Sequence, residues 1–112
     1  MRVYISGKMT GCPDLNRQAF DAAEKRLTAQ GHFAINPHRI NALFGTAEEL
    51  ECSYFALCAP LARAVMDADL AAVRSCDAIY LLKGWENSRG AKKELTEALA
   101  HGLQIMQEGG EE

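Results

Sequence analysis

Paired cysteines, an excess of positive charge and long apolar runs are all missing from this 112-residue sequence. None of the four cysteines forms a C-x-x-C pair and the three histidines are scattered, so we expect reduced thiols, no metal and no cofactor. A formal net charge of −3 argues against a duplex nucleic-acid partner but is compatible with a small anionic ligand. No stretch approaches the roughly 18 apolar residues that span a membrane, and the start lacks a signal-peptide pattern, so we expect a cytoplasmic protein with no membrane partner.

The composition is that of one globular domain. Apolar residues make up 48% and charged residues 24% of the chain, whose length leaves no room for a second core. We therefore expect a single domain over residues 1–107, followed by a frayed acidic tail at 108–112.

Short β-rich segments alternate with longer helical ones along the chain. The patterns predict strands at 2–6, 32–36, 77–82 and 103–106, and helices at 15–30, 60–76 and 89–101. Asp14 is the expected N-cap of the first helix, Pro60 opens the second, and Gly31 and Gly102 follow helix ends. The stretch 38–59 is hard to assign, and a short helix over 47–57 is one interpretation of it.

This alternation predicts an α/β fold. The expected architecture is a small, doubly wound, flavodoxin- or Rossmann-like parallel sheet of about four strands in the order 2-1-3-4, with helices on both faces. Ligands of such sheets bind outside the carboxyl ends of the first and third strands, where the winding direction switches. The loops SGKMTG and LKGWENSRG follow these two strands and should therefore border the site.

Two carboxylates stand beside apolar helix faces. Asp69 lies on the shoulder of a predicted stripe made by Ala62, Met66, Leu70 and Val73, whereas Asp67 is turned toward solvent. A carboxylate near a core needs partners, because its ionised form is otherwise costly. Asp69 therefore either has a structural role, as the acceptor for a loop amide or the partner in a salt bridge, or it faces a pocket.

Glu94 repeats this pattern in the last predicted helix. It lies between Ala91 and Ala98 on the inward face, and Glu97 points elsewhere. We expect its first-turn position near the positive helix end to keep it ionised, a placement that fits dipole complementarity as well as catalysis.

The loops offer further candidates. Ser88 is a natural N-cap, and the free N–H groups behind it are suited to a phosphate. Trp85, after Gly84, is suited to stacking on a base or a neighbouring subunit, or to acting as a hydrophobic lid. Tyr4 is ordinary core material unless its hydroxyl reaches the pocket.

Taken together, these segments resemble the nucleoside 2-deoxyribosyltransferase-like superfamily, and most closely a short bacterial and phage branch of it. The resemblance spans nearly the whole chain. It is carried by VYISG-x-MTG with Pro13, Asn16 and Phe20 behind it, by Asn36-Pro37, and by DADLAAVRSCDAIYLLKGWENSRGAKKEL.

The resemblance implies specific catalytic roles. A Gly-x-x-x-Glu-Leu pattern places Glu94 at the position of the nucleophile that forms a covalent sugar–enzyme intermediate, and Asp69 and Tyr4 match its assistants. Ser88 matches a serine that contacts the 5′-phosphate in nucleotide-cleaving relatives. The first loop departs from those relatives, because Lys8-Met9-Thr10 replaces Ser-x-Arg; Arg89 or Lys8 is a candidate substitute.

These observations support two hypotheses of different kinds. The first is an enzyme acting at the N-glycosidic bond of a (deoxy)nucleoside or its 5′-monophosphate, as transferase or hydrolase, in a homo-oligomer with a shared pocket. The alternative is a nucleotide-binding module without catalysis. Beyond the three catalytic candidates, the predicted substrate-binding residues are Ser6, Gly7, Lys8, Met9, Gly11, Gly84, Trp85, Ser88, Arg89 and Gly90.

Overall fold

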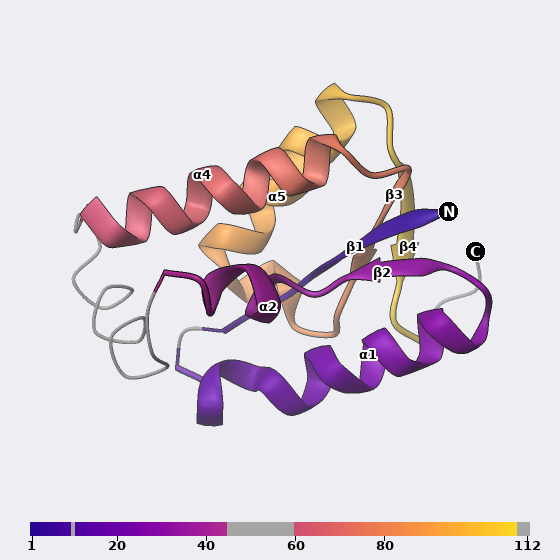
Figure 1. The fold of residues 1–112 in the computed structure, drawn as a ribbon, viewed down its shortest axis with the longest axis horizontal. Coiled ribbons are helices and arrows are strands. Elements are labelled where there is room, and N and C mark those ends of the chain that lie inside the picture. Colours follow the sequence, from indigo (N-terminus) through magenta and orange to yellow (C-terminus); the bar gives the residue numbers. More distant parts are fainter. Residues whose placement is uncertain (10, 45–59, 110–112) are drawn as a thin grey trace.

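The computed structural model describes residues 1–9, 11–44 and 60–109. The short helix predicted over 47–57 lies outside these residues, as does the end of the acidic tail. Within the described part, a four-stranded sheet has helices on both of its faces (Figure 1).

The sheet is entirely parallel, in the order β2-β1-β3-β4. Its strands are β1 (Arg2–Ser6), β2 (Phe33–Ile35), β3 (Ala78–Leu81) and β4 (Gln104–Gln107). In register, Tyr4 of the central β1 pairs with Ile35 on one side and Ile79 on the other. The predicted fold class and strand order are thus confirmed.

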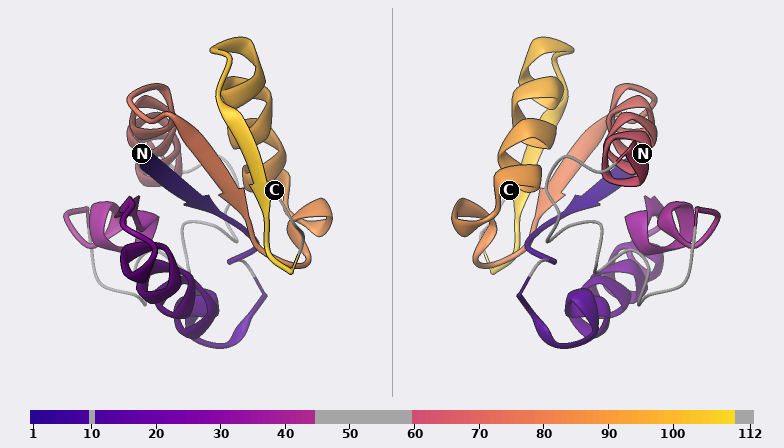
Figure 2. Two further views of the ribbon diagram at one scale, coloured as in Figure 1. Left: turned by 90° about the vertical axis from the view of Figure 1, so that its right-hand side faces the viewer. Right: turned by 90° about the vertical axis from the view of Figure 1, so that its left-hand side faces the viewer.

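Alternate residues of β1 pack against different helices. Val3 and Ile5 share a buried cluster with α1 (Arg17–Ala29). Tyr4 lies in a second cluster on the opposite face, with residues of α4 (Pro60–Arg74) and α5 (Arg89–Ala100). Figure 2 shows the sheet between these two groups of helices. The period-two pattern of β1 therefore decides which of its side chains face α4 and α5.

Local sequence signals explain most of the helix boundaries. Ser88 caps α5 by accepting a hydrogen bond from the Ala91 N–H at 3.0 Å. Asn36 caps α2 (Pro37–Asn41), a short helix in the stretch that the sequence left unassigned. Gly31 and Gly102 adopt positive φ beyond their helices, as predicted.

The expected N-cap at Asp14 is wrong. Residues Pro13–Asn16 form a 3₁₀ turn in which Asp14, Leu15 and Asn16 are all left-handed, and α1 begins only at Arg17. Burial of Leu15 against Val65 of α4 accompanies this turn. Tertiary packing thus overrides the capping preference of Asp14.

Glu108, the first residue of the predicted acidic tail, contacts the end of β3 and the residue Lys83. The Glu108 N–H donates to the Leu81 carbonyl at 2.8 Å, and the Glu108 carboxylate accepts from the Lys83 N–H at 2.9 Å. Glu108 therefore extends the contacts of β4 with β3.

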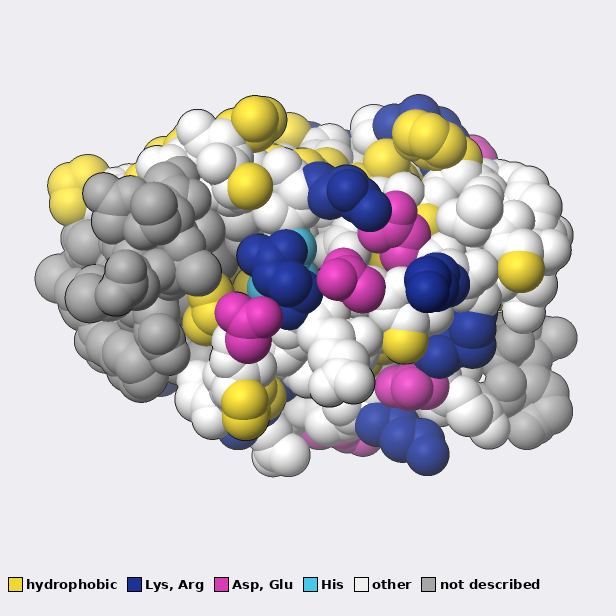
Figure 3. Space-filling view, turned by 60° about the horizontal axis from the view of Figure 1, so that its bottom comes forward, with side chains coloured by type: hydrophobic (Ala, Val, Ile, Leu, Met, Phe, Trp, Pro, Cys, Tyr) yellow, Lys and Arg dark blue, Asp and Glu magenta, His cyan; other side chains and the backbone are white. Residues whose placement is uncertain are grey.

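The charge distribution on the surface and the character of the described helices are the features that matter for binding to nucleic acids and for crossing membranes. On the face shown in Figure 3, basic and acidic side chains are interspersed rather than gathered by sign. Among the described helices, none combines the length and apolar character required to cross a bilayer.

Candidate active site

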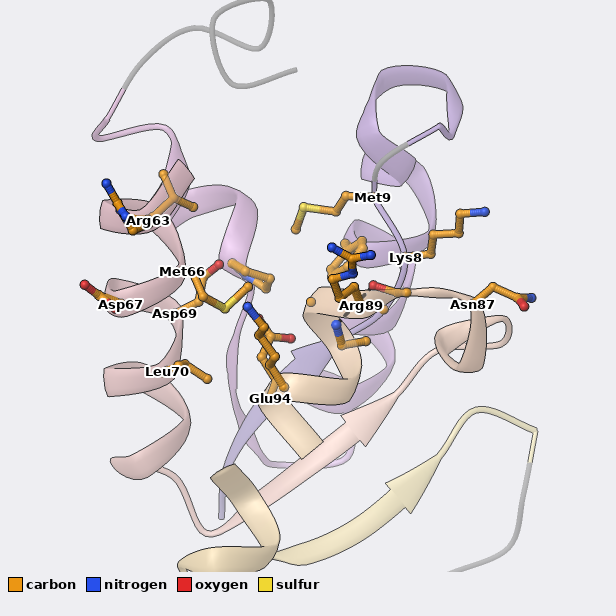
Figure 4. A pocket seen from close by; sticks show the side chains of 18 residues that line it. Lys8, Met9, Arg63, Met66, Asp67, Asp69, Leu70, Asn87, Arg89 and Glu94 are labelled. Carbon is orange, nitrogen blue, oxygen red and sulfur yellow. Dashed lines mark hydrogen bonds between the residues drawn. The ribbon is translucent and has the colours of Figure 1, made fainter. Parts of the chain in front are cut away.

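A cavity of about 710 Å³ opens between the carboxyl end of β1 and the facing sides of α4 and α5 (Figure 4). The loop after β1 and the start of α5 both contribute to it, as the strand order predicted. Its described lining consists of Gly7, Lys8, Met9, Phe20, Pro37, Arg63, Val65, Met66, Asp67, Asp69, Leu70, Asn87, Ser88, Arg89, Gly90, Ala91, Lys93 and Glu94.

Glu94 is held by two hydroxyl groups from β1. The Tyr4 hydroxyl donates to Oε2 at 2.9 Å, and the Ser6 hydroxyl donates to Oε1 at 2.6 Å. Only 6% of Glu94 is exposed, while Tyr4 and Ser6 are fully buried. Because Tyr4 and Ser6 are two residues apart on one strand, both point at α5, and together they fix the carboxylate in one orientation.

Burial governs the charge of Glu94. Desolvation raises its pKa to about 7, although the hydrogen bonds from Ser6 and Tyr4 favour the ionised form and limit the rise. The expected first-turn position of Glu94 is wrong. The side chain belongs to the second turn of α5, and its desolvation outweighs the effect of the helix end.

Asp69 is the second buried carboxyl group of the site, with 4% of its surface exposed. Burial and the nearby charge of Glu94 raise the pKa of Asp69 to about 9. It does not lie on the shoulder of an apolar stripe, because the buried face of α4 runs through Val65, Asp69 and Val73. Asp69 occupies the centre of that face, whereas Met66 and Leu70 are half-buried and line the cavity.

Glu97 and Asp67, the acids that neighbour Glu94 and Asp69 in sequence, both point away from the site, as predicted. Glu97 is bound by Arg74 at 2.8 Å and by His101 at 3.2 Å, away from the cavity. Asp67 is exposed, and although it borders the cavity rim its side chain points away from Glu94 (Figure 4). Position on the helix face therefore separates Asp69 and Glu94 from ordinary surface acids.

The predicted catalytic and binding residues divide into two groups. Asp69 and Glu94 line the cavity together with Gly7, Lys8, Met9, Ser88, Arg89 and Gly90, while Tyr4 and Ser6 reach it through Glu94. Gly11, Gly84 and Trp85 are not among the lining residues. Trp85 is half-buried and packs against the core cluster that contains Tyr4 and Ile79.

Sequence reasoning missed several lining residues. Val65, Met66 and Leu70 form an apolar wall on α4, and Arg63 and Lys93 border the cavity from α4 and α5. Met66 and Leu70 belong to the predicted apolar stripe, because periodicity alone does not tell a core residue from a pocket residue. The hydrogen bond from Ser6 to Glu94 was also missed, although its spacing from Tyr4 could have suggested it.

Among residues 1–9, 11–44 and 60–109, no group of three or more His, Cys, Asp or Glu side chains is placed to hold a metal ion. Cys12 and Cys76 have free thiols, whereas Cys52 and Cys58 lie outside this part of the chain. Burial raises the pKa of the Cys76 thiol, which makes it a poor nucleophile.

A family model described as a domain of unknown function, DUF4406, matches residues 1–107, and the chain belongs to this family. No curated protein matches it. Among solved structures, it is similar to the 2-deoxyribosyltransferase of the psychrotolerant bacterium Bacillus psychrosaccharolyticus. The two share 17% identity and superpose with a TM-score of 0.66, over 96% of this chain and 71% of the other. At this identity the likeness shows a shared fold.

Proposed function

For this member of DUF4406, we propose an enzyme that cleaves or transfers at the N-glycosidic bond of a deoxynucleoside or its 5′-monophosphate, with Glu94 as nucleophile. One observation carries the proposal. A buried carboxylate held by two hydroxyl donors shares a cavity with a second buried carboxyl group of higher pKa. Two carboxyl groups whose environments separate their pKa values are the usual equipment for glycosyl transfer with retention.

In the first step, an ionised oxygen of Glu94 attacks the anomeric carbon of the sugar. A bond forms between that carbon and the carboxylate oxygen, and the carbon–nitrogen bond to the base breaks. The electron pair of the broken bond passes to the base nitrogen. Asp69, whose pKa of about 9 keeps it protonated at neutral pH, supplies the proton that neutralises the leaving base.

In the second step, an acceptor releases the sugar from Glu94. Water or the ring nitrogen of another base attacks the anomeric carbon, and the ester bond to Glu94 breaks. The Asp69 carboxylate takes the proton that the acceptor loses, which returns both carboxyl groups to their starting states. Water as the acceptor makes the enzyme a hydrolase, and a base makes it a transferase.

Tyr4 and Ser6 act by positioning in this scheme. Their hydroxyl groups bind both oxygens of Glu94 and so hold it in one rotamer and help to keep it ionised despite its burial. Such preorganisation matters because misplacement of a nucleophile by about 1 Å can cost 10²-fold in rate.

The proposal is tested by a chromatographic assay of base release and base exchange over a panel of deoxynucleosides and their 5′-monophosphates. Glu94→Gln should abolish turnover, whereas Glu97→Gln on the same helix should leave it unchanged, because Glu97 faces Arg74 outside the cavity. Exchange that depends on an added free base identifies a transferase. Release of base without exchange identifies a hydrolase.

Two results would contradict the proposal. Turnover that survives in the Glu94→Gln variant excludes Glu94 as the nucleophile. Absence of turnover across the panel, from folded protein that still binds nucleotides, would favour the non-catalytic nucleotide-binding module.

A further inference from the structure

The cavity has a cationic rim in addition to its two buried carboxyl groups. The basic side chains of this rim are Lys8 after β1, Arg63 on α4, and Arg89 and Lys93 on α5, which line the cavity together with the exposed acid Asp67. The four side chains come from three separate segments, so they gather at the cavity through the fold and not through a run of basic sequence.

The two rim arginines differ from the other arginines in the described part of the chain. Arg17, Arg26, Arg39 and Arg74 each form an ion pair with a carboxylate, and Arg2 binds Ser75 through its guanidinium group. Arg63 and Arg89 form no ion pair or side-chain hydrogen bond with the described residues. The donors of Arg89 are therefore available to a ligand in the cavity, whereas the Arg63 side chain extends away from it, on the same side of α4 as Asp67 (Figure 4).

Arg89 is the rim residue best placed to bind that ligand. Figure 4 shows its side chain over the cavity, whereas the side chains of Lys8 and Arg63 extend outward from it. Ser88, the residue before it, already uses its hydroxyl oxygen to cap α5. A guanidinium group binds phosphate oxygens through two parallel N–H bonds, which a lysine ammonium does not reproduce.

The cavity thus presents three kinds of surface to one ligand. Asp69 and Glu94 supply the acid and nucleophile, Val65, Met66 and Leu70 supply an apolar wall, and the cationic rim supplies positive charge. A nucleoside alone would satisfy the first two surfaces and leave the rim unused. A nucleoside carrying a phosphate would engage all three.

Resting on the proposed function, we infer that the substrate is a deoxynucleoside 5′-monophosphate and that Arg89 binds its phosphate. Lys8, Arg63 and Lys93 add to the positive potential at the cavity and draw the anion toward it. Arg89 is then the residue that distinguishes a 5′-phosphate from a 5′-hydroxyl group.

Calorimetric titration of the Glu94→Gln protein tests this inference without turnover. The probes are four deoxynucleosides, their 5′-monophosphates, 2-deoxyribose 5-phosphate and inorganic phosphate. We expect a monophosphate to bind about ten-fold or more tightly than its nucleoside at low salt, and the advantage to shrink as ionic strength rises. Binding of phosphate alone with the same affinity as the monophosphate would overturn the inference, because the site would then recognise the anion only.

Adding Arg89→Gln should remove most of the monophosphate advantage and leave nucleoside affinity within about two-fold, while Arg89→Lys should retain part of it. Lys92→Gln is the matched control, because Lys92 is exposed on the same helix and does not line the cavity. Circular dichroism verifies that each variant is folded. An unchanged monophosphate advantage in the Arg89→Gln variant would overturn the inference.

The inference and the proposed function fail in different ways. If wild-type protein turns over nucleosides as well as monophosphates, and Arg89→Gln changes neither rate, the inference is wrong and the proposed function stands. If monophosphate binding requires Arg89 but wild-type protein never releases a base, phosphate recognition by Arg89 stands and the proposed function is wrong.

Discussion

At the scale of single residues, the proposed chemistry depends on the ionisation of Glu94 and Asp69. Both are buried, and desolvation raises the pKa of each, to about 7 for Glu94 and about 9 for Asp69. Glu94 alone receives hydrogen bonds from two hydroxyl groups. Glu94 therefore suits the role of nucleophile, because it loses its proton first, and Asp69 suits the role of acid, because it keeps its proton at neutral pH.

The pH dependence of kcat/KM follows from this order. The reaction needs ionised Glu94, so the rate should rise as pH increases through about 7, and it needs protonated Asp69, so the rate should fall as pH increases through about 9. Initial rates measured from pH 5 to 10 should give a bell-shaped profile with its maximum near pH 8. A profile without an alkaline limb would remove Asp69 as the acid.

The two hydroxyl donors give a second residue-scale prediction. Ser6→Ala and Tyr4→Phe each remove a bond that favours ionised Glu94, so each should move the acidic limb of the profile to higher pH. We expect kcat/KM at pH 7 to fall by about ten-fold or more in either variant, because one charge-assisted hydrogen bond is worth roughly 1.5–3 kcal/mol. Rates lowered equally at every pH would indicate a merely structural role.

At the scale of single elements, the burial of Asp69 on α4 should lower the free energy of unfolding as pH rises. A folded-state pKa of about 9, above the roughly 3.9 of an unfolded Asp, means that the folded protein holds an extra proton between these values. The favourable contribution is fully present below the unfolded pKa and is lost as pH rises. The free energy of unfolding should therefore fall by about 1.4 kcal/mol per pH unit in this window.

Urea unfolding of wild type and Asp69→Asn between pH 7 and 9 tests that cost. Glu94 makes a similar contribution only below about pH 7, so this interval isolates Asp69. Asp69→Asn should flatten the dependence on pH and make the protein more stable at pH 8, while it loses activity. Parallel curves for the two proteins would show that Asp69 is ionised in the fold.

The loop after β1 is positioned by the close approach of Gly7 to Leu82, the residue that follows β3. A Cβ atom at Gly7 would lie 2.8 Å from Leu82 Cδ1 and 2.9 Å from Leu82 Cβ, and Leu82 is 1% exposed. Gly7→Ala should therefore destabilise the fold by about 1–3 kcal/mol through overpacking. Thermal unfolding measures the loss, and Leu82→Ala in the same chain should recover part of it. Additive losses in the double variant would rule out this contact as the cause.

At the scale of the whole molecule, the arrangement of strands was predictable and the composition of the cavity was less so. Strand–helix alternation and right-handed crossovers leave few topologies, which is why the order β2-β1-β3-β4 follows from the pattern. The short helix α2 lacks enough turns to show periodicity, and the left-handed turn at Asp14 depends on contacts that are distant in sequence. The sequence indicates that Asp69 and Glu94 are unusual. It does not predict that Asp69 lies at the centre of the buried face of α4, because that face was inferred from apolar residues alone.

Two expectations about the whole molecule remain predictions. The resemblance implies a homo-oligomer with a shared pocket and membership of a bacterial and phage branch. Size-exclusion chromatography with light scattering measures the first. A monomer that retains full activity would contradict a pocket shared between subunits.

A covalent bond between Glu94 and the sugar should be detectable by intact-mass spectrometry of protein quenched during turnover of a deoxynucleoside 5′-monophosphate. A slow 2-fluoro analogue, whose fluorine disfavours the oxocarbenium-like transition state, serves as a trap. We predict a mass increase equal to one glycosyl group, located by peptide mapping on Glu94 and absent from Glu94→Gln. Base release by wild type without any adduct, or an adduct on another residue, would show that Glu94 is not the nucleophile.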